Sequence, residues 1–185
     1  MQRRAMMALL TGAALAACAP LPNTNPIGRD VRAVLKFSSV TVNTTGAAFE
    51  SARAADYSSR LAPELKSLIE REFADRMDPG GVQLVVDIAR LNVAGATTTA
   101  FGRDRSTLQG SVRVMNTDGT LLGTYAIQTV AGDAAETTAG ALFGAAVNSG
   151  DGFYRKLVDG FARDTREQVL GGDLPGERMI RRMQY

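Results

Sequence analysis

The 185-residue sequence contains no histidine and no tryptophan, and its single cysteine is Cys18. Without histidine, a catalytic nucleophile–histidine pair cannot be built, and zinc sites lose their common ligands. The sequence also lacks a Gly-x-x-x-x-Gly-Lys-Ser/Thr loop, a dinucleotide-binding Gly-x-Gly-x-x-Gly after a strand, and a calcium-binding Asp-x-Asp-x-Asp-Gly loop. We therefore expect no cofactor, no bound metal and no enzymatic activity.

An excess of charge of one sign is lacking as well. The chain has 21 Lys and Arg against 19 Asp and Glu, and removal of Arg3 and Arg4 with the leader described below makes the two numbers equal. The remaining basic residues alternate with acids instead of forming the basic stripe that phosphate neutralisation requires. Nucleic acid is therefore not an expected partner.

The N-terminal segment has the anatomy of a secretory signal peptide. Two arginines, Arg3 and Arg4, precede an apolar run from Ala5 to Ala17 that contains Thr11 and Gly12 and ends at small residues. A membrane-spanning helix needs about 20 apolar residues, so this run is too short. We interpret residues 1–17 as a leader.

The end of this leader, Leu15-Ala16-Ala17-Cys18, resembles a bacterial lipobox. The resemblance implies that a lipoprotein signal peptidase recognises Leu15, Ala16 and Ala17, cuts before Cys18, and leaves a diacylglyceryl thioether and an amide-linked acyl group on that cysteine. Because Ala19, not Asp, follows, the chain resembles the outer-membrane class of lipoproteins that face the periplasm. Plain secretory cleavage and a cytosolic protein with an apolar start are the alternatives.

Hydrophobic periodicity divides the rest of the chain into one domain with flanking segments. Residues 18–30 are rich in proline and predict a lipidated cysteine and flexible tether, residues 31–172 an α/β domain, and residues 173–185 an irregular tail. Within the domain, alternating or apolar runs predict strands, and i, i+4, i+7 spacing predicts helices. The expected order is strand 31–43 with a bulge at Ser38–Ser39, helix 57–77, strands 82–93, 106–115 and 120–130, and helix 153–170.

This β-α-β-β-β-α order predicts a single two-layer α/β (α+β) domain: a mixed four-stranded sheet with two helices on one face. Behind a lipobox, the order resembles that of small envelope lipoproteins of unknown function. Their domain is similar to the N-terminal domain of TolB and to auxiliary lipoproteins of lipid transporters and outer-membrane assembly. The resemblance carries no functional residue to this chain beyond Cys18.

Three other features are candidates for function. Asp87 is the only acid inside an apolar strand, but an acid on the solvent face of a half-buried strand is the preferred interpretation. Segment 137–152, which includes Leu142, Phe143 and Val147, is a possible interaction surface, with a packed helix or a mobile loop as the alternative. The tail alternates basic and apolar residues that could contact anionic lipid, or it is a frayed terminus. These tail residues are Arg178, Met179, Ile180, Arg181, Arg182 and Met183.

Together these features predict a lipid-anchored periplasmic accessory or interaction protein in cell-envelope assembly, maintenance or transport. It would contact the membrane through acylated Cys18 and bind an envelope protein whose identity the sequence does not give. The alternatives are an envelope hydrolase or transferase that uses only carboxylates and hydroxyls, with Asp87 as its candidate, and a module that binds a lipid or glycan.

Overall fold

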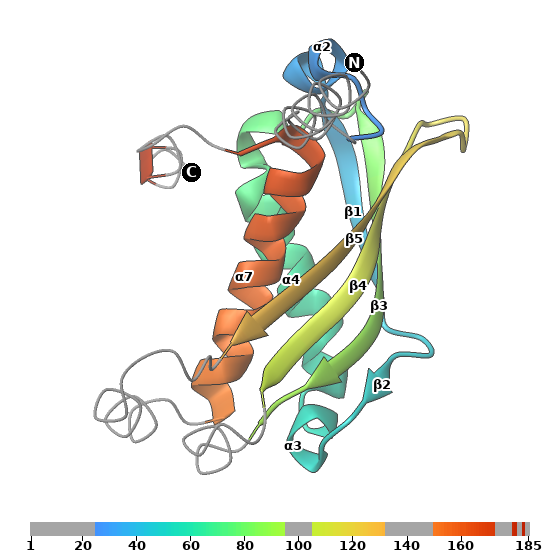
Figure 1. Cartoon of the computed structure of the whole chain (residues 1–185). Helices are drawn as coiled ribbons and strands as arrows, with labels where there is room; N and C mark the ends of the chain where they lie inside the picture. Colours follow the sequence, from blue (N-terminus) through green and yellow to red (C-terminus); the bar gives the residue numbers. More distant parts are fainter. Residues whose placement is uncertain (1–24, 95–104, 132–149, 173–178, 181–182, 184–185) are drawn as a thin grey trace, which may run out of the picture.

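The computed structural model describes residues 25–94, 105–131, 150–172, 179–180 and 183. Figure 1 shows one twisted sheet with two long helices lying side by side along it. In chain order the elements are α2 (Arg29–Val34), β1 (Phe37–Asn43), β2 (Ala48–Phe49), α3 (Ala52–Ala55), α4 (Ser58–Glu72), η2 (Ala74–Arg76), β3 (Val82–Asn92), β4 (Ser106–Met115), β5 (Leu121–Ala131) and α7 (Gly150–Leu170).

The sheet has the strand order β1-β3-β4-β5. β1 lies parallel to β3, with α4 in the connection between them, whereas β3, β4 and β5 are successive antiparallel neighbours. β2 extends the β1 edge by pairing in parallel with Arg90 and Leu91 of β3. The predicted α/β domain with a mixed sheet is confirmed, and β2 makes it five-stranded.

The core lies between the sheet and the paired helices α4 and α7. Leu61, Leu65 and Ile69, spaced by four residues along α4, are fully buried, as the helical period requires. The sheet buries alternate residues of its strands, among them Leu84, Val86, Leu108, Val112, Val114 and Ile127. The side chains between these buried positions point to the other face of the sheet, which neither α4 nor α7 covers (Figure 1).

A glycine lets α7 approach β5 closely. A Cβ at Gly160 would lie 2.6 Å from Cγ2 of Thr129, a distance at which something must shift. Beside this contact, Thr129 Oγ1 donates a hydrogen bond to Asp164 Oδ2 over 2.8 Å. α7 is therefore fixed to the edge strand by one close contact and one polar contact.

The first part of the predicted strand 31–43 is wrong. Arg29–Val34 form a helix, α2, and β1 begins only at Phe37. Arg32, buried on the inner side of α2, donates from Nη1 to the carbonyl of Leu170 over 3.4 Å at the C-terminal end of α7, where helix carbonyls lack intrahelical partners. The predicted bulge at Ser38–Ser39 is confirmed by a shift in register between Phe37 and Ser39.

The packed chain also begins earlier than the predicted boundary at residue 31. Asn25 donates from Nδ2 to the carbonyl of Gln168 over 2.8 Å, and its Oδ1 accepts from the hydroxyl of Tyr125 over 2.8 Å. Two elements distant in sequence, β5 and α7, thus bind the incoming chain. The last residues of the predicted tether belong to the domain.

The other element predictions agree closely with the structure. The three later strands differ from β3, β4 and β5 by no more than one residue at an end, and the predicted helices correspond to α4 with η2 and to α7. The predicted irregular tail lies mostly outside the described residues. Met179, Ile180 and Met183 are described there, with helical backbone and exposed side chains.

Candidate functional site

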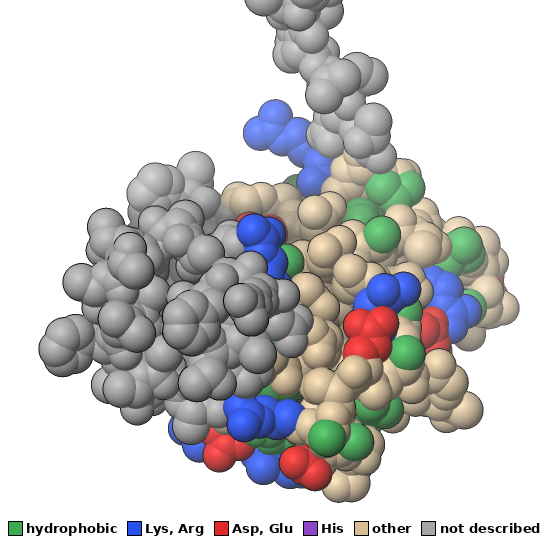
Figure 2. All heavy atoms as spheres, turned by 60° about the horizontal axis from the view of Figure 1, so that its bottom comes forward, with side chains coloured by type: hydrophobic (Ala, Val, Ile, Leu, Met, Phe, Trp, Pro, Cys, Tyr) green, Lys and Arg blue, Asp and Glu red, His purple; other side chains and the backbone are tan. Residues whose placement is uncertain are grey.

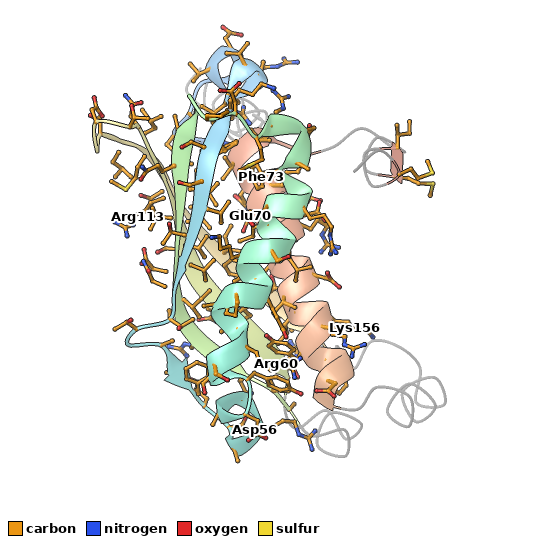
Figure 3. The ribbon with its side chains drawn as sticks, turned by 180° about the vertical axis from the view of Figure 1, so that it is seen from behind. Asp56, Arg60, Glu70, Phe73, Arg113 and Lys156 are labelled. Atoms are coloured by element: carbon orange, nitrogen blue, oxygen red, sulfur yellow. The ribbon has the colours of Figure 1, made fainter. Side chains whose placement is uncertain are left out.

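Asp87 lies on the sheet face away from the helices, and its side chain is 38% exposed. Asn43, directly opposite in β1, donates from Nδ2 to Asp87 Oδ1 over 2.9 Å. Arg113 of β4, labelled on the sheet side in Figure 3, donates from Nε and Nη2 to Asp87 Oδ2 over 3.0 and 2.7 Å. Three neighbouring strands therefore contribute one residue each to a cross-strand triad.

This triad fixes the charge of Asp87. The hydrogen bond from Asn43 is the largest influence on the pKa of the Asp87 carboxyl, which lies below its usual value. Burial acts in the opposite direction, and the Arg113 guanidinium lowers the pKa further. A carboxylate that stays ionised does not act as a proton donor near neutral pH. The predicted position of Asp87, on the solvent face of a half-buried strand, is confirmed.

A shallow hollow of about 550 Å³ adjoins Asp87 on the same sheet face. It lies beside the bulged residue Ala89, where the pairing of β3 with β4 shifts register. Its walls offer amide, hydroxyl and carboxylate groups, which suit hydrogen bonding to a polar group. The side chains around it include those of Asp87, Ala89, Gln109, Ser111, Ala126 and Gln128.

The β5 strand forms one edge of the sheet, since β4 is its only strand partner among the described residues. Its eleven residues include no charged side chain. Four alternate side chains along it, Thr124, Ala126, Gln128 and Val130, are exposed. Edge strands in natural proteins are commonly protected by charge, proline or shortness, and β5 has none of these features.

The opposite edge is built differently. β1 has seven residues and contains a register shift near its start. Beyond β1, the same edge is formed by the two-residue strand β2. Bulges and short strands disfavour pairing with another chain. β5 also shifts register near its start, at Leu122, but its pairing with β4 is continuous from Gly123 to Ala131. Of the two edges, β5 therefore offers the longer regular row of backbone donors and acceptors.

A pair of stacked tyrosines joins the helices at the end of the domain that holds α3 and the starts of α4 and α7, here called the tyrosine end. The rings of Tyr57 and Tyr154 lie 4.0 Å apart and within 4° of parallel, and the Arg60 guanidinium lies over both rings. The hydroxyl of Tyr57 donates to Asp151. No local sequence pattern predicts this cluster, because its residues are far apart in the chain.

The electrostatics of this cluster favour a structural role. Burial is the largest cause that raises the pKa of Tyr57 to about 12, and burial likewise raises the pKa of Tyr154. Both phenols are therefore neutral at physiological pH. Figure 2, which brings this end forward, shows basic and acidic side chains interspersed on its described surface instead of a patch of one sign.

Several predicted site residues lie outside the described residues. These are Cys18 with its recognition residues Leu15, Ala16 and Ala17, the possible interaction residues Leu142, Phe143 and Val147, and the tail arginines Arg178, Arg181 and Arg182. Within the part of the chain that the structure describes, no helix is long and apolar enough to cross a membrane, and no cluster of three or more acidic, histidine or cysteine side chains could hold a metal ion.

Comparison of the chain with protein-family models, with curated proteins and with solved structures finds no match.

Proposed function

We propose that the chain is a non-enzymatic, lipid-anchored periplasmic accessory protein of the bacterial cell envelope. In this proposal, acylated Cys18 holds the protein in the outer membrane and the α/β domain binds a partner protein. The lipobox-like sequence Leu15–Cys18 supports the anchor. Several acyl chains on one residue give a stable anchor, since each buried methylene contributes about 0.8 kcal/mol.

The observation that carries the binding role is the uncharged edge strand β5, which pairs with no second strand among the described residues. A strand edge binds an extended peptide by completing backbone hydrogen bonds, and the alternate side chains select its sequence. Because β5 has no charged residue, it neither attracts nor repels a charged segment strongly. The partner segment that fits is therefore an extended, uncharged stretch of another envelope protein.

The anchor is tested by processing and fractionation in a bacterium that makes the full chain. Globomycin, which blocks lipoprotein signal peptidase, should cause the unprocessed precursor to accumulate. Cys18→Ala should move the protein out of the membrane fraction. Retention of the Cys18→Ala protein in that fraction, or processing that continues under globomycin, would contradict the anchor.

The partner is tested by a photocrosslinking residue placed at Ala126 of β5 in cells. The expected adduct maps to an extended, uncharged segment of one envelope protein. Gln128→Lys, which adds a charge beside the probe, should reduce this adduct severalfold, because charge on an edge strand disfavours pairing. Thr41→Lys, an equally exposed position in β1 at the opposite edge, is the matched control and should leave it unchanged.

Two results would contradict the edge as the binding site. One is an adduct that Gln128→Lys and Thr41→Lys reduce equally. The other is an adduct between two copies of this chain, which would make β5 a self-pairing edge and not a site for another protein.

A further inference from the structure

Exposed aliphatic side chains gather at one end of the domain. Within residues 25–172, the described large apolar side chains that are exposed are Val31 (51%), Val34 (74%), Met77 (37%), Leu121 (54%) and Val130 (40%). All but Val130 belong to α2, to the residue after η2, or to the start of β5 beside its hairpin turn. These segments, with the C-terminal end of α7, form what we call the anchor end, at the top of Figure 1.

The most exposed pair lies on α2. Val31 and Val34 are three residues apart in a helix and so share one side of it, whereas Arg32 and Leu35 on the other side are buried. This short helix is held from two directions. Arg32 donates a hydrogen bond to the carbonyl of Leu170, and Arg76 Nη1 donates one to the carbonyl of Ala33 over 2.6 Å. The two valines are therefore presented to solvent on a fixed element.

The course of the chain indicates what covers them. Cys18 precedes Asn25 by seven residues, and Asn25 is bound to β5 and α7 just before α2. Seven extended residues span at most about 25 Å. If Cys18 is lipidated, as the proposed function requires, the anchor end is tied within this distance of the lipid surface.

We propose that the anchor end seats on the bilayer surface, with Val31 and Val34 in contact with the lipid interface. The proposal rests on the lipid anchor at Cys18. The exposed charges near the two valines include Lys36 and Asp78 beside Arg29 and Asp30, and are therefore of both signs. The contact is therefore apolar in character and should depend little on the fraction of anionic lipid.

The test uses two features of the sequence: it has no tryptophan and only one cysteine. The chain from Cys18 onward, which contains every described residue, is coupled through Cys18 to a maleimide-headgroup lipid in phosphatidylcholine vesicles. A single tryptophan is introduced by Val34→Trp, with Val130→Trp as the matched control. Both are exposed valines, but Val130 lies near the opposite end of the domain.

On vesicles, the tryptophan emission of the Val34→Trp protein should shift to the blue relative to the uncoupled protein, because an interfacial apolar side chain reaches about 5–10 Å into the headgroup boundary. When the acyl chains are brominated, the intensity of this emission should fall about twofold relative to vesicles without bromine. The Val130→Trp emission should not change, and both results should persist when anionic lipid is added. Absence of quenching at Val34→Trp, or equal quenching at both positions, would overturn the proposal.

This experiment is independent of cellular lipidation, because the coupling is chemical. A failure of the globomycin and Cys18→Ala tests would contradict the proposed anchor. A failure of the tryptophan test would contradict only the orientation of the domain. The circular dichroism spectra of both variants should match that of the unsubstituted chain, as expected for substitutions at exposed sites.

Discussion

The two ends of the domain differ in which side chains they bury and which they expose to solvent. At the tyrosine end, two amphipathic rings, those of Tyr57 and Tyr154, are buried against each other and covered by Arg60. At the anchor end, the purely aliphatic Val31 and Val34 are left in water on a helix that is itself firmly held. Exposure of the valines at the anchor end therefore does not come from a loose or frayed element, which is what a covering surface requires.

The largest effect is expected at the tyrosine end. Tyr154→Ala removes a fully buried ring from the contact between α4 and α7 and should lower the free energy of unfolding by about 3–5 kcal/mol. Tyr154→Phe keeps the ring and removes a buried hydroxyl that lies near the Glu64 carboxylate but makes no well-formed hydrogen bond among the described residues, so it should change stability by less than about 1 kcal/mol. Urea unfolding measures both, and equal losses for the two variants would contradict a role based on packing.

Between the two ends, Gly160 tests how closely α7 must lie on β5. Gly160→Ala adds a Cβ 2.6 Å from Thr129 Cγ2, and overpacking of about 1–3 kcal/mol should exceed the gain in helix propensity of about 1 kcal/mol. In a Thr129→Ser background, which removes Cγ2 and keeps the hydroxyl, the same substitution should become stabilising. A destabilisation that persists unchanged in that background would refute the close contact.

Asp87, on the open sheet face, is expected to make a smaller and pH-dependent contribution to the free energy of unfolding. The pKa of Asp87 is lower in the folded than in the unfolded protein. The contribution of its carboxylate to the free energy of unfolding is therefore complete above the unfolded-state pKa of about 3.9, and it is lost as pH falls through the folded-state pKa. Asp87→Asn should cost less than about 1 kcal/mol at pH 7, because solvent screens the pair, and still less at pH 3. Urea unfolding of Asp87→Asn and Arg113→Gln at both pH values is the measurement; a cost for either variant that grows as pH falls would contradict the triad.

The smallest effect is expected at the anchor end. Val34→Ser should change the free energy of unfolding by less than about 0.5 kcal/mol, since the side chain is 74% exposed. Val86→Ser, at a fully buried valine in β3, is the matched control and should cost several times more in the same urea titration. A large loss for Val34→Ser would show that the valine packs within the domain and would remove the contrast between its ends.

The sequence predicted the elements whose pattern is local. The alternation of β4 and the four-residue spacing of Leu61, Leu65 and Ile69 follow from one buried side, so periodicity locates them. α2 was missed because six residues with a mixed pattern suit a strand as well as a helix. The contact that it makes in the fold, from Arg32 to the carbonyl of Leu170 in α7, joins residues far apart in the sequence.

The candidate sites divide in the same way. The solvent-facing position of Asp87 followed from strand alternation, but its partners Asn43 and Arg113 follow only from the register of three strands. The stacking of Tyr57 on Tyr154 and the position of β5 at an edge of the sheet likewise depend on which elements become neighbours. Local periodicity contains no information on these neighbours.

Whether lipidated Cys18 holds the domain at a membrane can be measured by mass spectrometry of the N-terminal peptide of the protein isolated from membranes. We expect a mature chain that begins at Cys18 and carries a diacylglyceryl thioether and an amide-linked acyl group. A mature chain that begins at another residue, or that carries Cys18 as a free thiol, would contradict a lipid anchor at Cys18.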